Sequence, residues 1–227
     1  SGIATSALAY GREDALNSAP NADTESWNGT AWTEVADLNQ GRSRLVGVGV
    51  SNTSALCISG LPPPVANVLV EQWNGTSWTE IADINDGRWA LSGNGTITSA
   101  LVYGGSDLYA SPPRENVGVT ESWNGTAWTE VNDLNTARRE LAGSGADNTS
   151  ALAFGGEKPS DTEVDNVENW NGNVWAETTD LNTTRNNLAG NGTATSALAY
   201  GGSPGTGVSA ATEEWSGSSV TTKVLTD

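Results

Sequence analysis

One phrase of sequence returns five times along this chain of 227 residues and limits what the chain can fold into. The tetrapeptide Thr-Ser-Ala-Leu begins at Thr5, Thr53, Thr98, Thr149 and Thr195. A Trp-Asn-Gly phrase follows the first four tetrapeptides and Trp-Ser-Gly follows the fifth, so the repeat is about 47 residues long. Because a unit of this length cannot bury an apolar face alone, we expect the copies to pack on one another.

Each copy reads as four short strands, as the fourth copy shows. A Gly-rich segment at 140–145 is followed by a second segment at 149–154, which ends in a Gly-Gly pair. Residues 167–170 lead through Asn-Gly, a strong hairpin signal, into a fourth segment around Trp175. No segment carries the apolar stripe of a helix. This pattern predicts one propeller blade per copy.

We therefore predict an all-β chain, a five-bladed β-propeller with four antiparallel strands in each blade, forming a single domain over residues 1–227. The expected blades cover residues 1–41, 42–87, 88–137, 138–184 and 185–227. The first copy starts inside its first strand and no Met begins the chain, so we expect a processed, trimmed or excised product. We expect five blades to close into a ring, and the alternative is a segment of a longer propeller.

The order of an Arg, a small-residue strand, an aromatic-Gly-Gly phrase and two tryptophans resembles the Kelch repeat of β-propellers such as the galactose oxidase central domain. Tyr103, Phe154 and Tyr200 each precede Gly-Gly, whereas the first two copies have Tyr10-Gly-Arg and Ile58-Ser-Gly. The wording Trp-Asn-Gly-Thr-x-Trp-Thr-Glu is also similar to tandem repeats of marine bacteriophages, including those of cyanobacteria. This second resemblance implies a phage structural protein, located on the virion or a cell surface.

Composition argues against several classes of function. There are 27 acidic and 10 basic residues, a net charge of −17, which repels phosphate backbones and anionic lipid, so we expect no nucleic acid partner and no membrane insertion. The chain has no His, which removes the commonest general base and metal ligand, so we expect no catalytic residue, no metal and no cofactor. The single cysteine, Cys57, is expected to be a buried strand residue.

Comparison of the copies indicates which face binds. Strand alternation places the loops between second and third strands on the same face as the connections between blades. These loops differ in every copy and cover residues 11–24, 61–70, 106–120, 157–166 and 203–212. Variable loops on a fixed scaffold commonly carry binding sites. Trp89 and Tyr109 lie outside the repeat pattern and are the candidate aromatic ligand contacts on this face.

Four arginines at equivalent positions are further candidates for ligand binding: Arg42, Arg88, Arg138 and Arg185. Guanidinium groups clamp carboxylates and sulfates bidentately. The alternative is a structural role, in which each Arg pairs with the Asp of its own repeat or caps strand carbonyls between blades. We favour that alternative, because a residue present in every repeat usually serves the repeat. The paired tryptophans, such as Trp123 and Trp128, are expected to pack between blades for the same reason.

These observations predict a non-enzymatic recognition or attachment module, a virion-borne or cell-surface appendage. It would bind a glycan or a protein through the loops between second and third strands, next to other virion or surface proteins. A purely structural decoration or scaffold is the alternative. A glycan-active hydrolase is less favoured, because the expected innermost strands, such as residues 91–96, carry no Asp or Glu.

Overall fold

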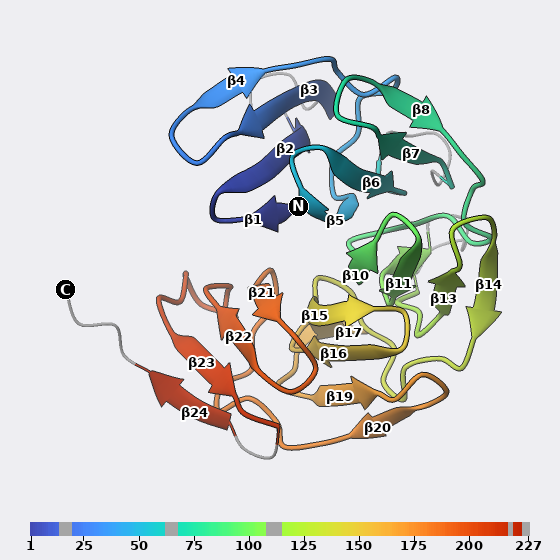
Figure 1. The fold of residues 1–227 in the computed structure, drawn as a ribbon. Helices are drawn as coiled ribbons and strands as arrows, with labels where there is room; N and C mark the ends of the chain where they lie inside the picture. The colour runs from blue at the N-terminus through green and yellow to red at the C-terminus, as the bar shows by residue number, and fades with distance from the viewer. Residues whose placement is uncertain (14–19, 62–67, 108–114, 218–219, 224–227) are drawn as a thin grey trace.

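The chain is all β in a computed structural model that describes residues 1–13, 20–61, 68–107, 115–217 and 220–223 (Figure 1). Every regular element in these ranges is a strand, and no helix there is long and apolar enough to cross a bilayer. Five four-stranded antiparallel sheets follow one another along the chain, and the first strand of each lies nearest the common axis. The structure is therefore the five-bladed β-propeller that the repeat predicts.

The strands of each blade follow one another in chain order. Blade 1 contains β1 (Gly2–Ile3), β2 (Ser6–Glu13), β3 (Pro20–Trp27) and β4 (Trp32–Glu34). Blade 2 contains β5 (Val46–Ser51), β6 (Ser54–Ile58), β7 (Val70–Trp73) and β8 (Trp78–Glu80). Blade 3 contains β10 (Ser92–Thr96), β11 (Ser99–Tyr103), β13 (Thr120–Trp123) and β14 (Trp128–Val131).

Blades 4 and 5 have the same order of strands. Blade 4 contains β15 (Ala142–Asp147), β16 (Ser150–Phe154), β19 (Val167–Trp170) and β20 (Trp175–Glu177). Blade 5 contains β21 (Ala189–Gly192), β22 (Ala197–Tyr200), β23 (Thr212–Trp215) and β24 (Val220–Lys223). Outside the blades, two short ladders pair β9 (Arg88–Trp89) with β12 (Ser106–Asp107), and β17 (Glu157–Lys158) with β18 (Thr162–Glu163).

The outer hairpin of each blade is built by the Trp-Asn-Gly phrase. In blade 3, Trp123 pairs with Trp128 across the hairpin, and the centroids of the two rings are 5.2 Å apart. The side-chain oxygen of Asn124 accepts two backbone N–H bonds inside the turn. Gly125 has a φ of 92°, a conformation that a side chain would disfavour. The repeated Asn-Gly is thus a turn that sets the register of the two outer strands.

Blades 1 and 2, and likewise blades 3 and 4, pack through a tyrosine of the second strand and the second tryptophan of the next blade. Tyr103 donates to a backbone carbonyl of blade 4 at 3.1 Å, and its ring meets Trp175 edge-on with centroids 4.9 Å apart. Trp175 Nε1 donates back to Thr120 Oγ1 of blade 3 at 3.1 Å. Tyr10 and Trp78 make the same edge contact between blades 1 and 2. These aromatic pairs fix the spacing of the blades.

The side of the propeller between blade 5 and blade 1 is open (Figure 1). The interface tyrosine of blade 5, Tyr200, is 41% exposed, and the interface tryptophan of blade 1, Trp32, is 48% exposed. A side chain added at Gly201 would meet no described atom within 4 Å, whereas one added at Gly104 would meet a carbonyl of the next blade. The expected closure of five blades onto each other is therefore not seen in this structure, because the described residues of blades 5 and 1 do not form the interface that joins the other blades.

The tryptophan packing predicts unequal costs for one substitution at two sites. Trp123 is 2% exposed and its Nε1 donates to the carbonyl of Ile97 at 2.9 Å, so Trp123→Ala should lower the free energy of unfolding by about 3–5 kcal/mol. Trp32→Ala, on the open side, is the matched control and should cost clearly less. Urea unfolding followed by circular dichroism measures both, and equal losses would contradict the assignment of Trp123 to the core.

Cys57 is buried on β6, as expected, and burial raises the pKa of its thiol to about 12. At pH 8 almost none of the thiol is ionised in the folded chain, and the thiolate is the form that reacts. We expect a disulfide reagent such as DTNB to label Cys57 only at the rate of unfolding. Fast labelling of the native protein, at a rate independent of added denaturant, would show instead that β6 is accessible.

Candidate functional site

The four repeat arginines are buried inside the blades and are paired there with glutamates. Each guanidinium meets a glutamate on the third strand of its blade: Arg42 with Glu71, Arg88 with Glu121, Arg138 with Glu168 and Arg185 with Glu213. The N···O distances run from 2.6 to 3.3 Å, and none of these eight residues is more than 2% exposed. We call each such unit a clamp.

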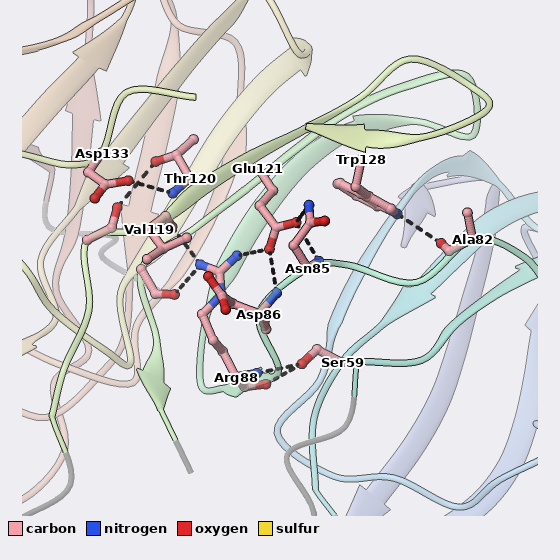
Figure 2. Close-up of polar contacts among 12 residues, drawn as sticks. Ser59, Ala82, Asn85, Asp86, Arg88, Val119, Thr120, Glu121, Trp128 and Asp133 are labelled. Carbon is pink, nitrogen blue, oxygen red and sulfur yellow. Dashed lines mark hydrogen bonds and ion pairs between the residues drawn. The ribbon is translucent and has the colours of Figure 1, made fainter. Parts of the chain in front are cut away.

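Figure 2 shows the clamp of blade 3, which also holds the connection from the previous blade. Glu121 Oε1 accepts from Arg88, and its Oε2 accepts from the backbone and side-chain nitrogens of Asn85, each at 2.7 Å. A second Arg88 nitrogen donates to carbonyls of the blade, including that of Val119 at 2.5 Å. Burial lowers the pKa of Arg88, and Glu121 opposes that shift. The clamp thus ties the connection at residues 85–88 to the third strand through Glu121, and to the end of the second strand through the bond from Arg88 to Gly104.

The repeat aspartates have a different task from the one predicted. Asp133 Oδ1 accepts the backbone N–H of Thr120 at 3.2 Å, at the start of the third strand (Figure 2). The prediction that each Arg pairs with the Asp of its own repeat is therefore wrong. The carboxylate that pairs with the arginine belongs to the glutamate of the third strand. The capping of carbonyls also differs from the predicted capping between blades: in all four clamps the arginine donates to the carbonyl of the residue just before the third strand of its own blade. The four arginines are thus buried, with their charge paired inside the blade.

The second residue after each clamp arginine turns toward the propeller axis. These residues are Arg44, Ala90, Glu140 and Asn187, and together with the leucine after each they line a pocket of about 340 Å³ that we call the axial mouth. All four have left-handed backbone, with φ between 50° and 54°. Their backbones form a ladder around the axis, because each N–H from Ala90 onward donates to the carbonyl of the residue before it in the set. The fold therefore fixes four side-chain positions around one pocket.

The side chains at these four positions differ in charge. The Glu140 carboxylate accepts a hydrogen bond from Asn187 Nδ2 at 2.6 Å and lies 3.8 Å from the Arg44 guanidinium. The side chain of Arg44 is 44% exposed and that of Glu140 is 13% exposed. The mouth thus presents a cation, a methyl group, an anion and an amide on equivalent backbone. Such a set can donate and accept hydrogen bonds at once, as recognition of a polar ligand requires.

Trp89 lies beside the mouth, but two arginines cover its ring. The guanidinium carbons of Arg44 and Arg139 are 4.9 and 5.3 Å from the ring centroid, and Trp89 is only 4% exposed. Arg139 is held by Glu157 at 2.5 Å and by Asp161 at 3.0 Å. The predicted ligand contact is therefore an aromatic support for two cations, which gain cation–π attraction from it. A ligand above Trp89 would meet the arginines first.

The variable loops begin next to the mouth. The residue after each clamp arginine pairs with the start of the loop between second and third strands: Ser43 with Leu61, Trp89 with Ser106, Arg139 with Glu157 and Asn186 with Ser203. Blade connections and variable loops therefore share one face, as strand alternation predicts. Tyr109, the other aromatic candidate of this face, lies outside the described residues.

The central channel differs from the mouth in chemistry. It has a volume of about 560 Å³ and is lined by small residues of the innermost strands, such as Gly47, Gly93 and Gly143. No Asp or Glu is among the described residues that line it. In the described ranges, no group of three His, Cys, Asp or Glu residues is placed to hold a metal ion. Among the described residues that line the two pockets, the charged side chains are Arg44 and Glu140 of the mouth.

Sequence reasoning missed most residues of the mouth. The two positions after each clamp arginine read Ser-Arg, Trp-Ala, Arg-Glu and Asn-Asn in the four copies, and a leucine follows every time. At these positions the sequence predicts only Trp89 as a ligand contact, because this tryptophan lies outside the repeat pattern. The signal in the sequence is that the two residues between the repeated Arg and the repeated Leu change in charge from copy to copy. This change identifies Arg44, Arg139, Glu140 and Asn187.

Comparison with known proteins supports the fold. No family model and no curated protein sequence matches this chain. Among solved structures, 193 chains are similar to it. One is the structure of YjhT, with a TM-score of 0.79 and 12% sequence identity, over 99% of this chain and 82% of that one. At this identity the likeness shows the β-propeller fold alone.

The clamps predict that an arginine inside the blade stabilises the fold far more than one on its surface. Arg138→Gln should lower the free energy of unfolding by about 3–5 kcal/mol, because Glu168 would keep a buried charge with no cation. Arg12→Gln is the control: its pair with Asp23 is 3.2 Å long but exposed, and is worth less than about 1 kcal/mol. Chemical unfolding compares them, and an Arg138 variant as stable as the Arg12 variant would refute the structural role.

Proposed function

We propose that this propeller is a non-enzymatic recognition or attachment module that binds a glycan or a protein through the face carrying the axial mouth and the variable loops. One observation carries the proposal. The residues that build the blades repeat from copy to copy, whereas residues at equivalent places around the mouth change from Arg44 to Ala90, Glu140 and Asn187. Side chains that vary on a fixed backbone serve a partner rather than the fold.

The chemistry of the mouth favours a small polar group as the part recognised. Its volume of about 340 Å³ is at the lower end for small-molecule pockets, so one sugar unit suits it better than a broad protein surface. Sugar hydroxyls both donate and accept hydrogen bonds, and the mouth offers donors on Arg44 and Asn187 and an acceptor on Glu140. Because Glu140 already binds both neighbours, these groups are held in place before a ligand arrives.

The Kelch-like nature of the repeat and a virion or cell-surface location are part of the same proposal. The Gly-Gly phrase has a physical reason in this fold, since Gly104 and Gly105 have φ of 67° and 105° and lie against carbonyls of neighbouring connections. A similar need for close approach explains why a Kelch-like phrase recurs. The likeness of the repeat wording to marine phage proteins supports a virion-borne appendage, with other virion proteins as neighbours.

A purely structural decoration is the alternative, and one observation favours it. The charged groups of the mouth are already satisfied by each other, and Trp89 is covered by arginines. A network of this kind also serves to seal the end of a channel. Removal of the charged side chains of the mouth distinguishes the two functions. It should lower the stability of the fold if the network seals the channel, and the affinity for a ligand if the network recognises one.

Binding to a glycan array and to intact marine bacterial cells tests the proposal. We expect specific binding that falls about 10- to 100-fold in the double variant Arg44→Ala, Glu140→Gln, which removes charged hydrogen-bonding groups. Thr126→Ala, on an exposed turn of the opposite face, is the control and should bind as the parent does. Unfolding curves show whether the double variant keeps the fold. Absence of specific binding by the parent, or loss of stability without loss of binding, would favour the structural alternative.

A further inference from the structure

The open side of the propeller consists of two unused halves of the interface that joins other blades. On blade 5, Leu198 and Tyr200 are 40% and 41% exposed, whereas the equivalent Leu101 and Tyr103 of blade 3 are fully buried. On blade 1, Trp32 is 48% exposed, and the equivalent tryptophans of blades 2 to 4 are 5–7% exposed. The exposed residues of these two blades are therefore of the same types that bury each other at interfaces between other blades.

Blade 1 also has a glutamate at the clamp position that lacks, among the described residues, the arginine and asparagine partners of the other clamps. Glu25 stands two residues before Trp27, as Glu71 stands before Trp73. In blades 2 to 5 this glutamate is buried and binds an arginine and an asparagine of the incoming connection. Glu25 is exposed, and no described side chain forms an ion pair with it. Its position is that of a receptor for a connection from a preceding blade.

A pocket of about 410 Å³ lies beside Glu25 and has an excess of negative charge. Its lining includes the acids Asp23, Glu25 and Glu34 and a single cation, Arg12, which is paired with Asp23 at 3.2 Å. Two carboxylates are thus left for an incoming cation. This charge complements the guanidinium that fills the same place in the other blades.

We propose that the open side binds one further blade of the same repeat. Its second tryptophan would pack on Tyr200, its tyrosine would pack on Trp32, and the connection that follows its fourth strand would bring an Asn and an Arg to Glu25. Every one of these contacts already exists at the interfaces between blades 1 to 5. Direct closure of blade 5 onto blade 1 would satisfy the aromatic residues but would leave Glu25 without its arginine.

The comparison with YjhT agrees with a sixth blade. This chain aligns over 99% of its length with a TM-score of 0.79, so the two chains share the β-propeller fold. The alignment covers 82% of that chain, and the remainder is close in length to one repeat of about 47 residues. In this chain, the exposed interface residues of blades 1 and 5 leave space for one more blade.

A six-repeat protein tests the proposal. A copy of residues 92–143 placed ahead of Ser1 keeps the phase of the repeat and adds a connection with its own Asn and Arg. We expect hydrogen exchange in residues 20–34 and 197–200 to slow by at least about tenfold relative to the 227-residue chain. Glu25→Gln supplies a matched comparison, since it should lower the melting temperature of the six-repeat protein and leave that of the parent unchanged.

Three results would overturn the proposal. The added repeat could leave exchange in both segments unchanged, which would show that it does not dock. A disulfide that forms readily in the parent chain between Trp32→Cys and Tyr200→Cys would show that five blades close directly. Sedimentation of the parent as a dimer that Tyr200→Asp dissociates would show that a second copy covers the open side.

Discussion

The clamp between arginine, glutamate and asparagine is the interaction on which the rest of the propeller depends. Burial of two opposite charges is costly unless both are fully hydrogen-bonded, so a clamp is stable only when connection, second strand and third strand are all in place. Glu121 accepts from both Arg88 and Asn85, and Arg88 reaches carbonyls on either side of it. The clamp therefore favours one arrangement of each blade over others, which is the specificity that a chain of nearly identical repeats needs.

Rigidity below the mouth allows variation at the mouth. The clamp fixes the backbone two residues before Arg44, Ala90, Glu140 and Asn187, and the leucine after each fixes the other side. All four residues adopt left-handed φ without being glycine, a conformation that costs about 1 kcal/mol or more and persists where the surroundings impose it. Since the surroundings determine this backbone, the side chains are free to differ in charge.

The sequence was sufficient for whatever depends on local spacing. Asn-Gly turns, Gly-Gly pairs and the period of the repeat predicted the blades, and recurrence alone suggested that the arginines are structural. It was insufficient where distant segments meet. Asp133 is five residues from Arg138 and seemed its natural partner, whereas Glu168, thirty residues away, faces it across the sheet. Closure of the ring depends on contacts of the same kind, because blades meet through residues far apart in the sequence, such as Tyr103 and Trp175.

The open side and the mouth are linked through the same connections. Four connections contribute to the mouth, and its backbone ladder begins at Arg44 and ends at Asn187, the residues nearest the open side along that ladder. A further blade that clamps Glu25 must bring its connection past this gap, and the residues after its arginine would then stand between Asn187 and Arg44. Completion of the circle would therefore add a fifth variable position to the mouth. The packing of the blades and the arrangement of the mouth are thus two results of one repeated clamp, which buries one pair of charges and places the next residues around the axis.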